Sequence, residues 1–213
     1  MAEHVAHHFE DAEQQREAAT LGMWAFLITE IMFFGGLFAG YTVYRSTYFD
    51  AFAEGSRHLD LVLGTVNTAI LIGSSLTMAL AVQAAQRSRR GPQVVFLLLT
   101  ILLGLAFLGI KAVEYGHKFE QHLVPGRFFS WPGPHASNVQ LFFSFYFAMT
   151  GMHALHMIIG IGLLIWLTIQ ARRGRFTGSY YNPMEVSGLY WHFVDIVWIF
   201  LFPLLYLIDR HVH

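Results

Sequence analysis

The 213-residue sequence contains no cysteine and little charge, because only 13% of its residues are Asp, Glu, Lys or Arg. The absence of cysteine excludes disulfides, thiolate metal sites and thiol nucleophiles. The charged fraction is about half of the roughly 25% that is usual in soluble domains, so a large water-exposed surface is not expected. A formal net charge of −1 gives no reason to expect nucleic acid as a partner.

Apolar residues make up 55% of the chain and gather in five long stretches. A transmembrane helix needs about 20 mostly apolar residues. We therefore predict an all-α, polytopic membrane protein: a polar N-terminal segment at 1–20, followed by a single bundle of five helices at 21–210. The predicted spans are about 21–44, 61–84, 93–115, 138–169 and 185–208.

Arginines are concentrated in the two loops that follow the second and fourth predicted spans. They are Arg87, Arg89, Arg90, Arg172, Arg173 and Arg175. Cytoplasmic loops of membrane proteins have an excess of Lys and Arg. We therefore predict that the N-terminus is cytoplasmic and that the C-terminus lies outside, on the periplasmic side.

Six ionisable residues stand out within or at the ends of the apolar stretches. They are Glu30, Glu114, His153, His156, His192 and Asp195. An ionisable group in hydrocarbon is costly, so it usually pairs with another polar group or marks a functional site. These residues are the first candidates for a site.

Glu30 lies within the first predicted span and permits two interpretations. It either forms a structural hydrogen bond between helices, or it binds a proton or lipid. Gly36 and Gly40 form a GxxxG motif, and Gly35 precedes them. Small residues at this spacing let a second helix approach closely, although a GxxxG motif recurs in many spans by chance. We predict helix packing at these three glycines.

His153 and His156 lie three residues apart on the fourth span and therefore share a helix face. One interpretation is a haem or metal site, since histidine is a common ligand. The other is a hydrogen-bonded packing face. A haem held by two histidines needs one ligand on each side of its ring, and only His192 on the fifth span could supply the second. We favour packing.

The fifth span contains His192 and Asp195, which are also three residues apart and able to pair. Such a pair is either a proton relay or a buried polar contact that fixes the helix register. Trp191 and Trp198 flank it and are expected to take part in the same polar packing.

Lys111 and Glu114 lie near the end of the third span. We predict that they form an ion pair close to the outer interface, where the long stem of Lys111 can reach the lipid headgroups. No residue of the chain is predicted to be catalytic or to ligate a metal.

Four segments together carry a resemblance to a known family. They are Glu30 with the following Phe33-Phe34-Gly35-Gly36, Lys111-Ala-Val-Glu114-Tyr115, Thr150-Gly-Met-His153-Ala-Leu-His156-Met-Ile-Ile-Gly160 and Trp191-His192-Phe-Val-Asp195-Ile-Val-Trp198. In that order and on those spans, they resemble subunit III of the haem–copper oxidases, or cytochrome c oxidase subunit III, in its short five-helix bacterial form.

The resemblance implies a non-catalytic accessory subunit of a terminal oxidase in the bacterial inner (plasma) membrane. It implies that this chain binds no cofactor and that haem and copper lie in partner subunits. Subunit I is the expected direct partner, beside other oxidase subunits, bound phospholipid and a candidate respiratory supercomplex. The implied role is to bind lipid and to support proton uptake and long-lived turnover.

By the same resemblance, the lipid-binding or proton-related residues are Glu30, Lys111, Glu114, His153 and His156, and Glu30 is the family's carbodiimide-reactive carboxyl group. Seven-helix relatives have two further N-terminal helices that form one wall of a lipid cleft. Here that cleft is expected to be open or completed by another chain. Lys111 replaces the glutamine that is common in the long forms.

Two other functions stay open at this point. The chain could be the equivalent subunit of a quinol oxidase or of a nitric oxide reductase, because the electron donor is decided in other subunits. Alternatively, it could be a small membrane cytochrome or proton-path protein that uses His153, His156 and His192.

Overall fold

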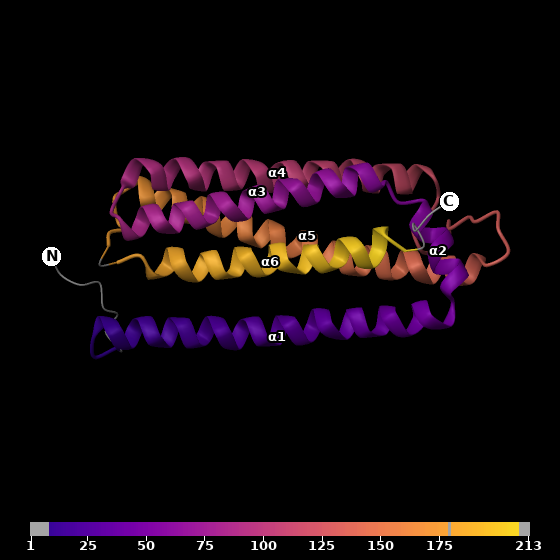
Figure 1. Ribbon diagram of the computed structural model, residues 1–213, viewed down its shortest axis with the longest axis horizontal. Coiled ribbons are helices and arrows are strands. Elements are labelled where there is room, and N and C mark those ends of the chain that lie inside the picture. Colours follow the sequence, from indigo (N-terminus) through magenta and orange to yellow (C-terminus); the bar gives the residue numbers. More distant parts are fainter. Residues whose placement is uncertain (1–8, 179, 209–213) are drawn as a thin grey trace.

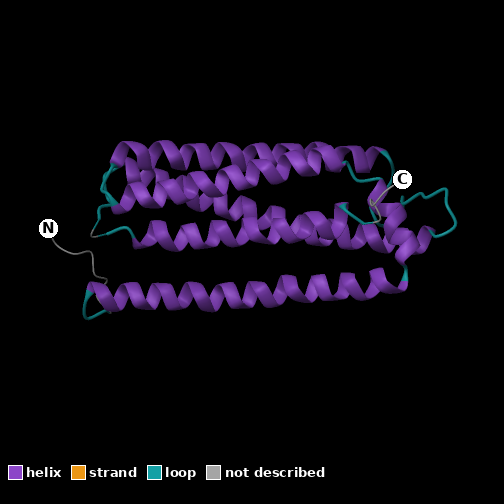
Figure 2. Cartoon of the chain, in the orientation of Figure 1, coloured by secondary structure: helices purple, strands orange, loops and turns teal. Residues whose placement is uncertain are grey.

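The computed structural model describes residues 9–178 and 180–208, and within these ranges the chain folds into helices without any strand (Figures 1 and 2). The helices are α1 (Ala12–Thr47), α2 (Phe49–Arg57), α3 (Leu61–Gln86), α4 (Arg90–Glu120), α5 (Ala136–Arg172) and α6 (Asn182–Tyr206). All except α2 are long and apolar enough to cross a membrane. The predicted all-α membrane bundle is confirmed, with α1, α3, α4, α5 and α6 as its five spans.

The helix starts follow local sequence signals. Asp11 caps α1 by accepting a hydrogen bond from the Gln14 backbone N–H at 2.7 Å. The helix thus begins inside the predicted polar segment and continues without a break into the first span. Residues 1–8 of that segment, and residues 209–210 at the end of the predicted bundle, lie outside the described residues.

Helix α2 was not predicted and lies across the end of the bundle opposite the start of α1 (Figure 1). Phe52 is fully buried, and the Ser56 hydroxyl donates to the Leu205 carbonyl at 2.8 Å. Gly55 lies so close to the Phe142 ring that a Cβ would not fit. With nine residues, α2 is far shorter than the roughly 20 apolar residues of a membrane span, so it was not among the predicted spans.

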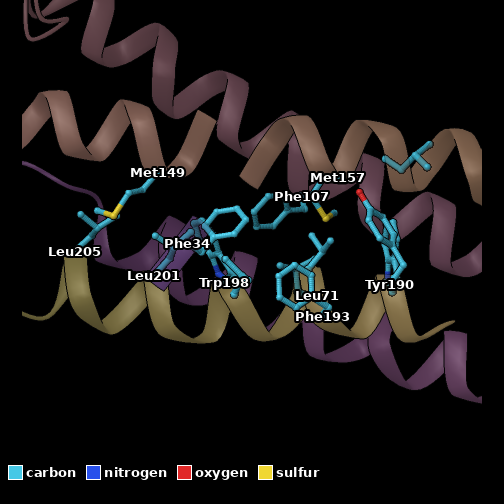
Figure 3. Packing of buried hydrophobic residues seen from close by; sticks show 14 of the residues in the cluster. Phe34, Leu71, Phe107, Met149, Met157, Tyr190, Phe193, Trp198, Leu201 and Leu205 are labelled. Carbon is cyan, nitrogen blue, oxygen red and sulfur yellow. The ribbon is translucent and has the colours of Figure 1, made fainter. Parts of the chain in front are cut away.

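Helices α3, α4, α5 and α6 form a closely packed group. Trp191 of α6 lies between two glycines: a Cβ on Gly104 of α4 would be 2.9 Å from its ring, and one on Gly160 of α5 would be 3.0 Å away. Figure 3 shows further large side chains, among them Phe107 and Trp198, stacked in the same core. The glycines therefore let the backbones approach an aromatic core.

Helix α1 lies to one side of this group (Figure 1). Within the described residues it packs against α2, α5 and α6, but not against α3 or α4. Two of its large apolar side chains, Leu21 and Met32, are 72% and 73% exposed. Exposed apolar side chains on a membrane helix face lipid or another chain.

Candidate functional site

A groove of about 500 Å³ separates α1 from α6. Its walls are almost entirely apolar, and His192 is the one ionisable residue among the lining residues of the described chain. The lining residues are Trp24, Leu27, Ile31, Phe34, Gly35 and Phe38 from α1, with Leu189, His192, Phe193, Ile196, Val197 and Phe200 from α6. Both walls are membrane helices, so the groove opens among lipid tails rather than into water.

Glu30 and His156 join α1 to α5 next to this groove. The Glu30 Oε2 atom lies 3.1 Å from His156 Nε2, and the two side chains are 19% and 11% exposed. Leu27 and Ile31, which are close neighbours of Glu30 on α1, line the groove itself. Glu30 therefore forms the hydrogen bond between helices that was one of its two interpretations.

The hydrogen bonds of His156 fix how its nitrogens are used. Its Nδ1 lies 2.8 Å from the Met152 carbonyl oxygen, which can only accept, so Nδ1 has a hydrogen. The hydrogen bond between Nε2 and Glu30 then requires one more proton, on either the imidazole or the carboxyl group. The arrangement can therefore hold one proton between α1 and α5, and both nitrogens of His156 are engaged.

His153 has a different environment from His156, although one helix supplies both. Its ring is 1% exposed and lies between Phe107 and Trp198, with ring centroids 5.4 and 5.3 Å away. Neither ring nitrogen has a hydrogen-bond partner within the described chain. The sequence placed the two histidines on one face; both contact α6, but His153 also contacts α4 whereas His156 contacts α1.

These positions do not fit a haem. Aromatic rings occupy the space on both sides of His153, and both nitrogens of His156 already have partners. In the part of the chain that the structure describes, no group of three or more His, Cys, Asp or Glu side chains could hold a metal ion.

Lys111 and Glu114 form the predicted ion pair, at 2.8 Å, but the prediction that Lys111 reaches the lipid headgroups is wrong. Lys111 is 4% exposed and Glu114 is 1% exposed, so neither reaches the headgroups. The ammonium group of Lys111 contacts the hydroxyls of Tyr206 at 2.8 Å and Tyr146 at 3.2 Å, and Tyr206 donates to Glu114 at 2.6 Å. We call these four residues the Lys111 cluster; it joins α4, α5 and α6.

Sequence reasoning missed the two tyrosines of the Lys111 cluster because they come from other helices. The signal that could have found them is membrane depth. Lys111 lies in the last third of α4, Tyr146 in the first third of α5 and Tyr206 at the end of α6. Antiparallel neighbours bring these positions to the same level, where the two hydroxyls supply hydrogen bonds that the buried charges need.

The predicted pairing of His192 with Asp195 is not formed. The His192 Nδ1 atom lies 2.7 Å from the Ser75 hydroxyl on α3, and neither carboxyl oxygen of Asp195 has a hydrogen-bond partner within the described residues. Ser75 is also close to Asp195, but it is His192 that it meets at hydrogen-bonding distance. The spacing of three residues would allow His192 and Asp195 to pair. The imidazole of His192 instead contacts the Ser75 hydroxyl on α3.

Trp191 and Trp198 take part in polar packing between helices. The indole N–H of Trp191 donates to the Ser74 hydroxyl at 3.1 Å, and that of Trp198 donates to the Thr68 hydroxyl at 3.0 Å. Both acceptors lie on α3, so these bonds fix the register of α6 against α3.

The three glycines of α1 differ in their surroundings. A Cβ on Gly40 would lie 3.6 Å from the Phe145 ring of α5, whereas Gly35 and Gly36 have nothing within 4 Å. Gly35 lines the α1–α6 groove, and Gly36 does not. The predicted close helix packing at Gly35 and Gly36 is therefore not made by any described helix of this chain.

Comparison with known proteins gives concordant matches. Residues 3–209 match the family model described as cytochrome c oxidase subunit III. The chain is 32% identical to cytochrome c oxidase subunit 3 of Thermostichus vulcanus, over 93% of this chain and 92% of that protein. It is 35% identical to the protein of the same name in Corynebacterium diphtheriae, over 89% and 88%. It is 31% identical to cytochrome bo(3) ubiquinol oxidase subunit 3 of Pseudomonas aeruginosa, over 97% and 92%.

Proposed function

We propose that this chain is a non-catalytic subunit of a haem–copper oxidase complex. The chain belongs to the cytochrome c oxidase subunit III family, which makes it a subunit of such a complex. Its proposed tasks are to hold phospholipid in the α1–α6 groove and to sustain proton uptake and turnover. Haem and copper belong, in this proposal, to partner subunits, and the chain packs directly on subunit I.

The α1–α6 groove is the observation that carries the proposal. Its lining is apolar on both walls and its volume is about 500 Å³, within the usual range of small-molecule sites. In a bilayer, the ligand that such a lining selects is a lipid acyl chain. A phospholipid there would fill the space between α1 and α6 and add to the direct contacts that α1 already makes with α5 and α6.

The Glu30–His156 contact supports the proton-related part of the proposal. It holds one proton between two helices, with the Glu30 side chain 19% exposed beside the groove. A carboxyl group that is accessible from an apolar groove is the kind of group that a hydrophobic carbodiimide labels. We expect that label on Glu30.

The proposed setting is the bacterial plasma membrane, with the N-terminus in the cytoplasm. The arginine-rich loops after α3 and α5 support this orientation because they lie together at one end of the bundle, where the Ser88 hydroxyl accepts from the Gly178 backbone N–H at 2.7 Å. We propose cytochrome c as the electron donor of the complex. The quinol oxidase subunits among the relatives make quinol the second candidate.

The test is to purify the complex through a tag on this chain in mild detergent, and then to separate the chain from its partners. We expect haem-bearing polypeptides to co-purify and the separated chain to show no Soret absorption. Haem on the separated chain in stoichiometric amount would overturn the proposal. Intact assembly with lost haem in His192→Ala would favour a histidine-liganded cytochrome instead.

A further inference from the structure

A second groove, of about 390 Å³, lies between α3 and α6. Most of its lining is apolar, but Ser75, His192 and Asp195 meet at its floor. We call this the α3–α6 groove. Asp195 is 3% exposed, and neither of its carboxyl oxygens has a hydrogen-bond partner in the described chain. An unpaired carboxyl group in a membrane interior is unfavourable, so Asp195 lacks a hydrogen-bonding group that something outside the chain can supply.

The depth of Asp195 limits what that group can be. Helix α6 has 25 residues, and Asp195 lies near its middle. At about 1.5 Å per residue, Asp195 is roughly 15–20 Å from either helix end. The hydrocarbon core is about 30 Å thick, so Asp195 lies near its centre. A phospholipid headgroup does not reach this depth, and acyl chains have no hydrogen-bond donor.

The residues that line the α3–α6 groove have the spacing that suits contact with a further helix. Ser75 and Ala79 are four residues apart on α3 and both line the groove, which is the small-residue spacing that lets two membrane helices approach closely. On the other wall, the exposed Ile196 and Ile199 of α6 form a ridge at helical spacing. A partner helix could rest between this ridge and the small residues of α3.

We propose that a transmembrane helix of a partner oxidase subunit docks in the α3–α6 groove and donates a hydrogen bond from a mid-helix polar side chain to Asp195. The inference rests on the proposed function, which supplies the partner subunits. His192 and Ile196 line both grooves. The docked helix therefore also borders the α1–α6 groove and completes one side of the lipid site.

The first experiment compares assembly with the stability of the separated chain. In the full oxidase complex, Asp195→Leu should weaken retention of the haem-bearing partner in detergent by about threefold to thirtyfold, the usual range for one hydrogen bond between membrane helices. The melting temperature of the separated chain should not fall, because Leu removes an unpaired carboxyl group. Asp195→Asn should keep the partner, since its amide oxygen still accepts.

Two outcomes would overturn the inference. Either the Asp195→Leu complex holds its partner as firmly as the wild type, or the separated chain loses stability in step with assembly, which would give Asp195 a role inside the chain. If the wild-type chain retains no haem-bearing partner at all, the proposed function fails instead.

Steric variants test the groove independently of Asp195. Ala79→Trp should reduce partner retention, whereas Ala148→Trp, on an exposed position of α5 outside the grooves, should not. A photo-reactive benzoyl-phenylalanine in place of Ile72, which lines the groove and is 56% exposed, identifies the occupant. Adducts with a partner subunit support the inference. Adducts with phospholipid alone, or with a second copy of this chain, would contradict the inference. Equal partner retention in Ala79→Trp and Ala148→Trp would also contradict it.

Discussion

Helix α1 and the packed group of α3, α4, α5 and α6 are all apolar membrane helices, yet α1 is packed far more loosely than the other four. Only 11% of the most apolar window of α1 is buried within the chain, against 56% for α6. In the packed group of α3, α4, α5 and α6, glycines lie against aromatic rings such as Trp191 and Tyr206, whereas a groove lies along part of the contact between α1 and α6. The chain thus combines a closely packed scaffold of four helices with one helix that makes fewer contacts to it.

The two acid–base pairs follow the same division. Lys111 and Glu114 are buried and hydrogen bonded to each other and to tyrosine hydroxyls. Both charged groups therefore have their partners inside the scaffold. Glu30 and His156 connect the scaffold to α1 and stay partly open. The same kind of pair is therefore enclosed in one region and partly exposed beside a groove in the other.

The largest effect is expected in the scaffold. Lys111→Met leaves Glu114 buried without its cation, which should lower the free energy of unfolding by about 3–5 kcal/mol. Denaturant unfolding of the purified chain, followed by circular dichroism, measures the change. The double variant Lys111→Met with Glu114→Leu removes both charges and should be milder. A single variant as stable as the wild type would show that the pair is not needed for the scaffold.

The next effect concerns the tryptophan contact between helices. Gly104→Ala places a Cβ 2.9 Å from the Trp191 ring, and we expect a loss of about 1–3 kcal/mol from overpacking. Gly162→Ala is the matched control, because nothing lies within 4 Å of its Cβ position, and it should stay within about 0.5 kcal/mol of the wild type. Equal unfolding curves for both variants would argue against close packing at Gly104.

A smaller effect is expected where α1 meets α5. Glu30→Leu removes the bond to His156, worth about 0.6–2 kcal/mol, and should let α1 move without unfolding the scaffold. Because the chain has no cysteine, spin labels on Met32→Cys and Ile158→Cys can report the α1–α5 distance. We expect a broader distribution in Glu30→Leu than in Glu30→Gln, whose amide can still donate to the imidazole. Identical distributions would show that Glu30 does not hold α1.

The smallest effect on the free energy of unfolding is expected at two neighbouring glycines, Gly35 and Gly36. At Gly35 we also expect a change in the amount of bound lipid. Gly35→Trp projects into the α1–α6 groove and should reduce the phospholipid that co-purifies with the complex. Gly36→Trp has equal space around it but does not line the groove, so its lipid content should match the wild type. Mass spectrometry of the extracted lipid measures both. Unchanged lipid in Gly35→Trp would remove the groove as the lipid site.

The sequence predicts the spans well because twenty consecutive apolar residues have one main explanation. Each of the five predicted spans overlaps a helix that is long and apolar enough to cross a membrane, although α1 begins at Ala12, well before the predicted span. Spacing along one helix also predicts the Lys111–Glu114 pair correctly. These features depend on neighbours in the sequence.

The errors concern contacts between helices, which spacing does not determine. His192 meets Ser75 of α3 instead of Asp195, and Lys111 meets tyrosines instead of headgroups. In each case a polar group on another helix lay at the same depth and competed for the side chain. The sequence alone does not say which faces of two helices meet, so those partners could not be read from it.

The central claim is that Glu30 and His156, beside the lipid groove, sustain the oxidase during turnover without performing its chemistry. The most direct measurement is the number of turnovers that the complete oxidase makes before it loses activity, together with its initial rate, in wild type and Glu30→Gln. We predict that the variant lowers the number of turnovers more than the initial rate. An immediate collapse of the initial rate would contradict the claim and assign Glu30 a direct part in proton transfer.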